Sequence, residues 1–399
     1  MRILNAVVVT AALGTFVDIL DLTLFQSVRV ASLKDLGVGP EALFQTGIML
    51  LNIQLAGLLI GGLLWGVIAD RRGRRSVLFA SILMYSLTTL ACAWVSSVPM
   101  YALLRFVGGI GLAGEMGAGV TLIVEVMSRE NRGYGTTICA AAGVSGAIAG
   151  GVLATNLPWR TAYIIGGVAG LGLFLLRATT SESSMFKRSR ATDQSRGGLA
   201  LFRQWKTAKR FLLSLAIGLP IFFVLLIIAP FAPEIGAALA PGHTVTAAVG
   251  TGAVALGLTL GDVFSGLLSQ KLRSRRLPIA INIGLLAVLL LVFFFVPLPG
   301  NKLFSLFILA LGVAAGYFVL FLTNAAEQFG TNLRGTAAVS APNIMRAMVI
   351  PMTILMKTLS PSVGLRGALV AISGVSIVIA LLALRALPET FGRDLDFDE

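Results

Sequence analysis

The chain has 399 residues, of which 56% are hydrophobic and 12% are charged, about half the charged share of an ordinary soluble domain. A water-soluble fold could not hide so much apolar surface behind so few charges. A net charge of +13 would suggest nucleic-acid binding in a soluble protein, but here the basic residues come in bursts between long apolar stretches. Composition thus excludes a soluble enzyme, a DNA-binding protein and a disordered tail, and leaves a polytopic membrane protein.

We expect the chain to begin with a spanning helix and to hold no metal, cofactor or disulfide. Arg2 is followed by an apolar run that carries two aspartates and lacks a small-residue cleavage pattern, unlike a signal peptide. Cys92 and Cys139 lie inside apolar runs without ligand spacing, and His243 is the only histidine. These residues form no metal-binding pattern.

Long apolar runs follow one another along the whole chain, and the alternating pattern of membrane barrels is absent. A helix needs about 20 largely apolar residues to cross the hydrocarbon core of a bilayer. The runs predict an all-α membrane protein with twelve transmembrane helices in two pseudo-symmetric six-helix bundles. The predicted spans are 4–29, 44–69, 76–96, 99–124, 134–156, 160–179, 211–236, 244–269, 277–297, 302–324, 335–358 and 365–387.

One long hydrophilic segment divides the chain near its midpoint, and its Ser, Arg and Gly content suits a solvated linker. Its end, 199–210, could form a short amphipathic surface helix. The predicted domains are an N-terminal bundle at 1–179, a cytoplasmic linker at 180–210, a C-terminal bundle at 211–387 and a cytoplasmic tail at 388–399.

The basic residues indicate the orientation of these helices, because cytoplasmic loops carry an excess of Lys and Arg. With both termini in the cytoplasm, 23 of the 31 basic residues fall on the cytoplasmic side and six on the outer side, while Arg105 and Arg346 fall inside spans. The opposite orientation would invert this bias. We therefore expect a multi-pass protein of the plasma membrane, the inner membrane of a bacterium, with both termini cytoplasmic.

The two halves of the chain repeat each other. GVIADRRGRR at 66–75 is matched by GLLSQKLRSRR at 266–276, and WRTAYIIGGVAG at 159–170 by LRGALVAISGVS at 365–376. Each pair falls at the same place in the helix count of its half. Such an internal duplication is typical of transporters whose binding site lies between the repeats.

Three motifs lie on this framework. The first is Gly66-x-x-x-Asp70-Arg71-x-Gly73-Arg74-Arg75, between the second and third predicted helices. The second runs through the fourth helix, and the third is Pro388-Glu389-Thr390-x-Gly392-Arg393 near the end of the chain. In this order on twelve spans, the motifs resemble those of the major facilitator superfamily of secondary transporters, chiefly its metabolite–proton symporters and sugar porters. The second motif comprises Arg105, Gly109, Gly111, Gly114, Glu115, Gly117, Ala118, Glu125 and Asn131-Arg132-Gly133.

The sequence departs from this family pattern at two places. In the second copy of the first motif, Gln270 replaces the acid and Arg273 replaces the glycine, so any charge relay there is one-sided. In the fifth helix, a glycine run from Gly146 to Gly151 resembles a motif of drug–proton antiporters, but Ala147 stands where that motif has proline. An efflux antiporter is therefore an alternative to a symporter.

The arginines of the first motif could bind carboxylates and helix ends in one conformation and release them in another. Their alternative role is a topology anchor. In the second half we expect Asp262 to pair with Arg273 or other basic residues of its bundle, and Glu327 to pair with Arg334. The gating candidates are Gly66, Asp70, Arg71, Gly73, Arg74, Glu125, Arg132, Asp262, Glu327 and Arg334.

Charged residues inside the spans are the candidates for coupling, since a charge near the bilayer centre costs roughly 2.5–3.5 kcal/mol and needs a partner or a cavity. Asp18 and Asp21 lie on one face of the first helix. Two carboxylates this close do not both ionise easily in a low dielectric, so we expect one of them to carry a proton. The alternative is that one aspartate only pairs with a fixed arginine.

Three more buried charges complete the coupling candidates. Arg105 and Glu115 lie about 15 Å apart along the fourth helix and cannot pair with each other, but Arg105 could reach an aspartate of the first helix. Arg346 lies between two prolines of the eleventh helix, where it could contact a substrate anion or that aspartate. For each, a structural role is the alternative. The predicted coupling or substrate residues are Asp18, Asp21, Arg105, Glu115 and Arg346.

Aromatic and amide side chains are weaker candidates for the lining of a substrate cavity. The resemblance places helices 7 and 10 around such a cavity, although core packing is the commoner role of each Phe. The candidates are Phe25, Phe222, Tyr317, Phe321, Asn324 and Asn343.

These observations predict a transporter and not an enzyme. The chain has no nucleotide-binding loop, no paired metal spacing and no second histidine for a catalytic triad, so uphill transport must use an ion gradient. We expect a monomeric, proton-coupled secondary transporter that moves a small organic solute by alternating access, with sodium as the second choice of ion. The alternatives are a drug or metabolite efflux antiporter and, more remotely, a transport-inactive sensor on the same scaffold.

Overall fold

The computed structural model describes residues 6–72, 74–126, 132–179, 204–239, 242, 244–329 and 340–392. Within these ranges, every regular element is a helix. The chain divides into two compact units, and we describe each by itself. The first unit comprises Met1–Gly39 and Met49–Gly198, and the second comprises Pro40–Ile48 and Leu199–Glu399.

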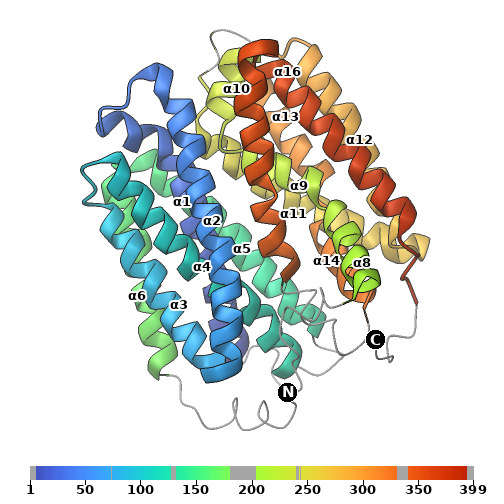
Figure 1. Cartoon of the computed structure of the whole chain (residues 1–399), viewed down its shortest axis with the longest axis horizontal. Coiled ribbons are helices and arrows are strands. Elements are labelled where there is room, and N and C mark those ends of the chain that lie inside the picture. The colour runs from blue at the N-terminus through green and yellow to red at the C-terminus, as the bar shows by residue number, and fades with distance from the viewer. Residues whose placement is uncertain are drawn as a thin grey trace. The chain divides into compact units, whose positions relative to one another are not determined.

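Six helices cover the six spans predicted for the first half of the chain. α1 packs against α4, α5 and α6, and α3 packs against α4 and α6 (Figure 1). The start of α2 belongs to the second unit. The bounds of these helices are α1 Ala6–Asp35, α2 Pro40–Arg72, α3 Arg74–Cys92, α4 Val98–Val126, α5 Arg132–Asn156 and α6 Trp159–Thr179.

Glycines of α5 allow α1 and α5 to cross in backbone contact. A Cβ on Gly146 would lie 2.2 Å from the carbonyl oxygen of Phe16, and one on Gly150 would lie 2.5 Å from Oγ1 of Thr23. Any larger residue would force the two helices apart, which is the usual reason for small residues between membrane helices. Close packing therefore accounts for these glycines of the run that resembles an antiporter motif.

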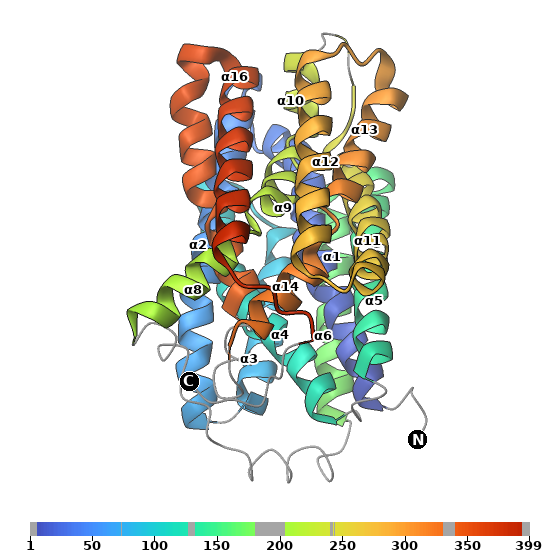
Figure 2. The ribbon, with the colours of Figure 1, turned by 90° about the vertical axis from the view of Figure 1, so that its right-hand side faces the viewer.

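The second unit contains shorter and more broken helices. α8 and α9 meet at a bend of 45°, and Figure 2 shows α8 inclined to the long helices of this unit. Pro220, in the first turn of α9, suits a helix start because proline has no N–H to donate. The bounds are α8 Trp205–Ala216, α9 Leu219–Phe223, η3 Val224–Ile228, α10 Ala232–Leu239, α11 Ala247–Leu272, α12 Arg276–Phe295, α13 Gly300–Ala315, α14 Phe318–Glu327, a helix at 340–347 and α16 Val349–Ala386.

The tenth predicted span is broken at Gly316, between α13 and α14. A Cβ on Gly316 would lie 2.4 Å from the Cα of Gly261, so α11 packs directly on the break. Ser265 donates a hydrogen bond to the Gly316 carbonyl at 2.8 Å, and Asp262 accepts one from the Val319 N–H at 3.0 Å. Two side chains of α11 thus satisfy backbone groups that the break exposes.

This geometry corrects the pairing expected for Asp262. Its carboxylate accepts a backbone N–H in the first turn of α14, whereas the sequence suggested Arg273 or other basic residues. Arg273 instead ends α11 in a left-handed conformation, with φ of 48°. An anionic side chain at a helix N-terminus is stabilised by the exposed N–H groups there.

In the described part of the chain, seven helical stretches are long and apolar enough to span a membrane, or eight if the bent α8–α9 pair is counted as one span. One of them, Ser340–Ala386, covers most of the last two predicted spans, 335–358 and 365–387, and Gly364 (φ 70°) turns the chain between them inside α16. The apolar part of α3, Ser76–Cys92, is shorter than a typical span. The protein is an all-α membrane protein.

Candidate functional site

An aspartate and an arginine meet in the interior of the first unit. Asp21 lies on α1 and Arg105 on α4, and Nη1 of Arg105 is 3.9 Å from Oδ2 of Asp21. Their side chains are 5% and 1% exposed. Two charges that are buried away from solvent interact much more strongly than they would in water, because the dielectric constant around them is low.

Arg105 has further partners that hold it in place. Its Nη2 donates to Sγ of Cys92 at 3.1 Å, and its guanidinium carbon lies 5.6 Å from the ring centre of Phe25 and 5.2 Å from that of Tyr163. The Tyr163 hydroxyl is hydrogen-bonded to that of Tyr101. Aromatic faces attract a cation, so the arginine is fixed by α1, α3 and α6 as well as by Asp21.

Asp21 has a second contact on α3 that the sequence did not reveal. Thr89, which is 1% exposed, donates its hydroxyl hydrogen to Oδ1 of Asp21. Asp18, the other aspartate of α1, is also buried and 3% exposed. Both aspartates of the predicted acidic pair are therefore buried, and among the described contacts the ion pair with Arg105 is made by Asp21.

A second buried ion pair lies farther along α4. Arg177, near the end of α6, binds Glu115 with Nη2–Oε1 and Nη1–Oε2 distances of 2.6 Å and 3.0 Å. Its Nη2 also donates to the carbonyl of Thr10 at 3.2 Å. A Cβ on Gly14 would lie 2.2 Å from this Nη2 and 2.6 Å from Oε1 of Glu115, so glycine makes room for the pair on α1.

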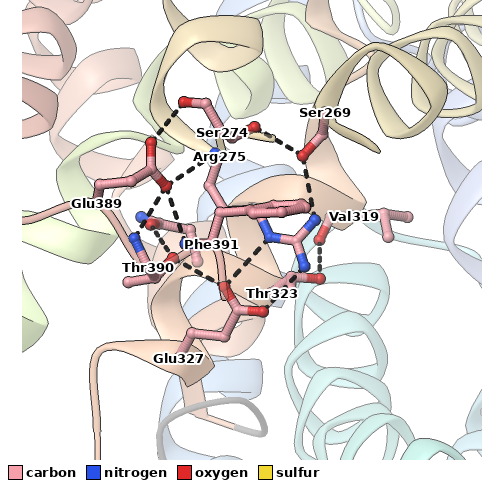
Figure 3. A network of polar contacts seen from close by, with 10 residues as sticks. Ser269, Ser274, Arg275, Val319, Thr323, Glu327, Glu389, Thr390 and Phe391 are labelled. Atoms are coloured by element: carbon pink, nitrogen blue, oxygen red, sulfur yellow. Dashed lines mark hydrogen bonds and ion pairs between the residues drawn. The ribbon is translucent and has the colours of Figure 1, made fainter. Parts of the chain in front are cut away.

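A network of polar contacts in the second unit ties the tail to the start of α12. Glu389 accepts hydrogen bonds from the backbone N–H groups of Arg275 at 2.9 Å and Arg276 at 3.2 Å, and from the hydroxyl of Ser274 (Figure 3). Partial burial would raise the pKa of Glu389, but these hydrogen bonds and one from the Phe391 N–H outweigh it and lower the pKa to about 2. The glutamate of the third motif thus caps α12 as an anion.

The same network gives Glu327 a described partner that the sequence did not suggest. Its carboxylate binds Arg275, with an Nη2–Oε1 distance of 3.0 Å, and accepts the hydroxyl of Thr390 at 2.8 Å. Figure 3 shows the Arg275 guanidinium between Ser269 and Glu327, with Phe391 beside it. Arg334, the expected partner, lies outside the described residues. Thr390 also donates to Asn324 at 3.3 Å, so this cavity candidate is held by the tail.

The remaining coupling and cavity candidates of the second unit are buried. Arg346 and Asn343 lie on the helix 340–347 and are 5% and 8% exposed. The hydroxyl of Tyr317 donates to the Ile217 carbonyl at 3.0 Å. Phe222 and Phe321 are at most 1% exposed, and both pack near the ring of Phe318.

The gating candidates of the first half all lie where the structure describes no side chain. Gly73, like Arg334, lies outside the described residues. The others lie on described helix backbone without described side chains, namely Gly66, Asp70, Arg71, Arg74, Glu125 and Arg132. In the part of the chain that is described, no three His, Cys, Asp or Glu side chains gather as metal ligands would.

The family model of the Major Facilitator Superfamily matches residues 11–352. The chain belongs to this superfamily. The chain is similar to a probable 4-methylmuconolactone transporter of Cupriavidus pinatubonensis, with 26% identity over 345 residues that cover 84% of this chain and 79% of that protein. A 3-(3-hydroxy-phenyl)propionate transporter of Escherichia coli K12 is 30% identical over 242 residues, 59% of each chain.

Solved structures agree on the fold. A crystal structure of a D-xylose-proton symporter matches with a TM-score of 0.76 and 18% identity, over 97% of this chain and 99% of that one. The superfamily protein described here is therefore a membrane transporter and not an enzyme, with the twelve-helix fold that the sequence predicted.

Proposed function

We propose that this superfamily member is a proton-coupled symporter that carries a small organic carboxylate across the bacterial inner membrane by alternating access. The observation that carries this proposal is the buried pair of Asp21 and Arg105. A carboxylate inside a membrane helix is costly unless it is paired or protonated, so such a residue typically serves transport.

The pair can exchange a proton for a change in conformation. While Asp21 is ionised, its charge attracts Arg105; a proton on Asp21 removes that attraction and leaves the arginine to its other partners, Cys92 and the aromatic rings. If one conformation of the transporter binds this proton more tightly than the other, protonation shifts the equilibrium between the two conformations toward it. Asp18 and Glu115 remain candidates in the same role, with Glu115 already neutralised by Arg177.

Two observations support a carboxylate as the substrate. Two relatives are named as transporters of 4-methylmuconolactone and of 3-(3-hydroxy-phenyl)propionate, and the second compound is an aromatic carboxylate. In the second unit, Arg346 is buried in the same fold unit as the aromatic side chains Phe222 and Phe321. A guanidinium and aromatic faces are the groups that would bind an aromatic carboxylate.

We further propose the arrangement that the sequence predicts around this site. A bundle at 1–179 and a bundle at 211–387 would move against each other, joined by a cytoplasmic linker at 180–210, in a monomer with both termini in the cytoplasm. The cluster of Arg275, Glu327 and Glu389 would then lie on the cytoplasmic side, as a gate candidate of the second half.

The test is transport in proteoliposomes with 3-(3-hydroxyphenyl)propionate as the probe. We expect Asp21→Asn to abolish accumulation driven by an inward proton gradient but to keep exchange of labelled for unlabelled probe, because exchange needs no net proton movement. Asp35→Asn is the matched control, since Asp35 lies on the same helix in a half-exposed pair with Arg160. It should accumulate the probe like the parent. Gradient-driven accumulation by Asp21→Asn would refute Asp21 as the proton site.

A further inference from the structure

Thr89 makes a contact with Asp21 that no motif of the sequence predicts. Its hydroxyl donates to Oδ1, while Oδ2 faces Arg105 at 3.9 Å. That distance is within ion-pair range but too long for a hydrogen bond, which needs about 2.7–3.2 Å. The hydroxyl of Thr89 therefore supplies the close polar contact of this carboxylate, and the arginine supplies charge at longer range.

Arg105 is kept at that distance by other groups. Cys92 lies one turn after Thr89 on α3 and accepts the Nη2 hydrogen of Arg105 at 3.1 Å. The ring centres of Phe25 and Tyr163 lie within 6 Å of the guanidinium carbon of Arg105. Since the arginine is held by these partners, the contact that changes most when Asp21 gains or loses its proton is the one with Thr89.

We propose that Thr89 is a positioning residue that sets the proton affinity of Asp21, an inference that rests on the proposed role of Asp21 as the proton site. A hydroxyl that donates to a carboxylate favours the ionised form. When the carboxyl is protonated, its new O–H can donate to the Thr89 oxygen, and the hydroxyl hydrogen can turn to a carbonyl of the preceding turn. Thr89 and the Asp21 carboxyl group thus stay hydrogen-bonded in both protonation states, and the bond to the ionised carboxylate is the stronger one.

Titratable and charged groups surround Asp21 on each neighbouring helix of the first unit. α4 contributes Arg105 and Tyr101, α6 contributes Tyr163, and α3 contributes Cys92 and Tyr85 beside Thr89. On α1 the nearest acid is Asp18. On α5 the titratable group among described side chains is Cys139, which is hydrogen-bonded to Thr15. Among the described side chains, Arg105 and Thr89 are the groups that contact the carboxylate itself.

The adjacent residue provides a matched control. Thr88 is also buried, at 8% exposure, but its hydroxyl bonds to the carbonyls of Met84 and Tyr85 in its own helix, at 3.0 Å each. Valine has the shape of threonine without the hydroxyl. Thr88→Val and Thr89→Val therefore remove the same group from neighbouring positions of one helix, and only the second removes a hydrogen bond to Asp21.

The experiment measures proton binding directly, without a substrate. In the detergent-purified full chain, pH-difference infrared spectra follow the carbonyl band of protonated carboxyl groups, and Asp21→Asn identifies the part that belongs to Asp21. We expect Thr89→Val to raise the midpoint pH at which the Asp21 band titrates by about one unit, because the ionised carboxylate loses one hydrogen bond. Thr89→Ser should restore the parent midpoint, and Thr88→Val should leave it unchanged.

The outcomes separate the two proposals. If Asp21→Asn removes no titrating band, Asp21 does not exchange a proton and the proposed function fails at this residue. If the band is present and Thr89→Val keeps the parent midpoint, the role of Thr89 is wrong while the proton site stands. A midpoint that moves equally in Thr88→Val would also contradict the inference, because it would trace the change to packing of α3.

Discussion

At the scale of single residues, the buried charges of the first unit occur as two ion pairs. Asp21 with Arg105 and Glu115 with Arg177 are each almost completely removed from solvent. Separation of such a pair leaves a buried charge without compensation, which costs far more than the loss of a pair at the surface. The pairs therefore stabilise the unit only as long as both members are present.

This cost predicts the behaviour of the Glu115–Arg177 pair. We expect Glu115→Gln and Arg177→Met each to lower the free energy of unfolding by about 3–5 kcal/mol, and the double variant to lose less than the sum. Thermal unfolding in detergent measures this. Asp35→Asn, which breaks the half-exposed pair with Arg160, should cost about 0–1 kcal/mol. Fully additive losses at Glu115 and Arg177 would show that the pair is not coupled.

Gly14 gives a second test of the same geometry. Gly14→Ala would place a methyl group 2.2 Å from Nη2 of Arg177 and 2.6 Å from Oε1 of Glu115, so both side chains must shift away from α1 and the geometry of their buried ion pair is disturbed. We expect a lower unfolding temperature than that of the parent. Gly62→Ala, with open space around the added Cβ, should have no such effect. Equal unfolding temperatures for both variants would contradict the placement of Arg177 beside Gly14.

The sequence allowed part of this site to be predicted. Asp18, Asp21, Arg105 and Glu115 were predicted because a charge inside an apolar run is unusual and points to function. Arg177 was missed because it lies at the end of its span, where the excess of cytoplasmic basic residues already explains an arginine. Thr89 was missed as well, since threonine is common in membrane helices and its partner lies on another helix.

At the scale of helices, capping by side chains from elsewhere in the chain holds the broken segments of the second unit. Glu389 caps α12, and Asp262 and Ser265 bind the two sides of the break between α13 and α14. Hydrophobicity predicted where the spans lie but not where they break, because the breaks at Gly316 and Gly364 depend on backbone conformation and neighbouring helices. The motif around Glu389 was recognised, but its partner at α12 required the fold.

The depressed pKa of Glu389 predicts how the cap responds to pH. Because the pKa of about 2 lies below the usual 4.5, the carboxylate adds stability at neutral pH that is lost as the pH falls from about 4.5 toward 2. Hydrogen–deuterium exchange should show the first turn of α12 opening more readily as the pH falls through this range, after correction for intrinsic exchange. In Glu389→Gln, the amides of this turn should exchange faster than in the parent at neutral pH, and their exchange should no longer change between pH 4.5 and 2. Amides as protected in this variant as in the parent would rule out the cap.

At the scale of the whole molecule, the superfamily and the all-α membrane fold are the properties that the sequence predicted correctly. The positive charge that would suggest nucleic acid in a soluble protein lies mainly in predicted cytoplasmic loops. The twelve spans and the superfamily follow from hydrophobic length and the order of three motifs. The substrate does not, because its binding depends on a few side chains of common type brought together by the fold.

The proposed orientation can be tested by labelling single cysteines in intact cells. In a background in which Cys92 and Cys139 are replaced, we expect Ser195→Cys in the linker to react with a membrane-impermeant maleimide only after the cells are opened. Asn301→Cys, exposed at the start of α13, should react in intact cells. Labelling of Ser195→Cys from outside would reverse the orientation.

The most direct test of proton-coupled transport is proton entry that accompanies the substrate. Proteoliposomes would hold a pH-sensitive dye, with no imposed gradient and the membrane potential clamped at zero, and 3-(3-hydroxyphenyl)propionate would be added outside. We predict that the lumen acidifies as labelled probe enters, and that Asp21→Asn shows no acidification. Entry of the probe into parent vesicles without acidification, or no entry even under an inward proton gradient, would contradict the account.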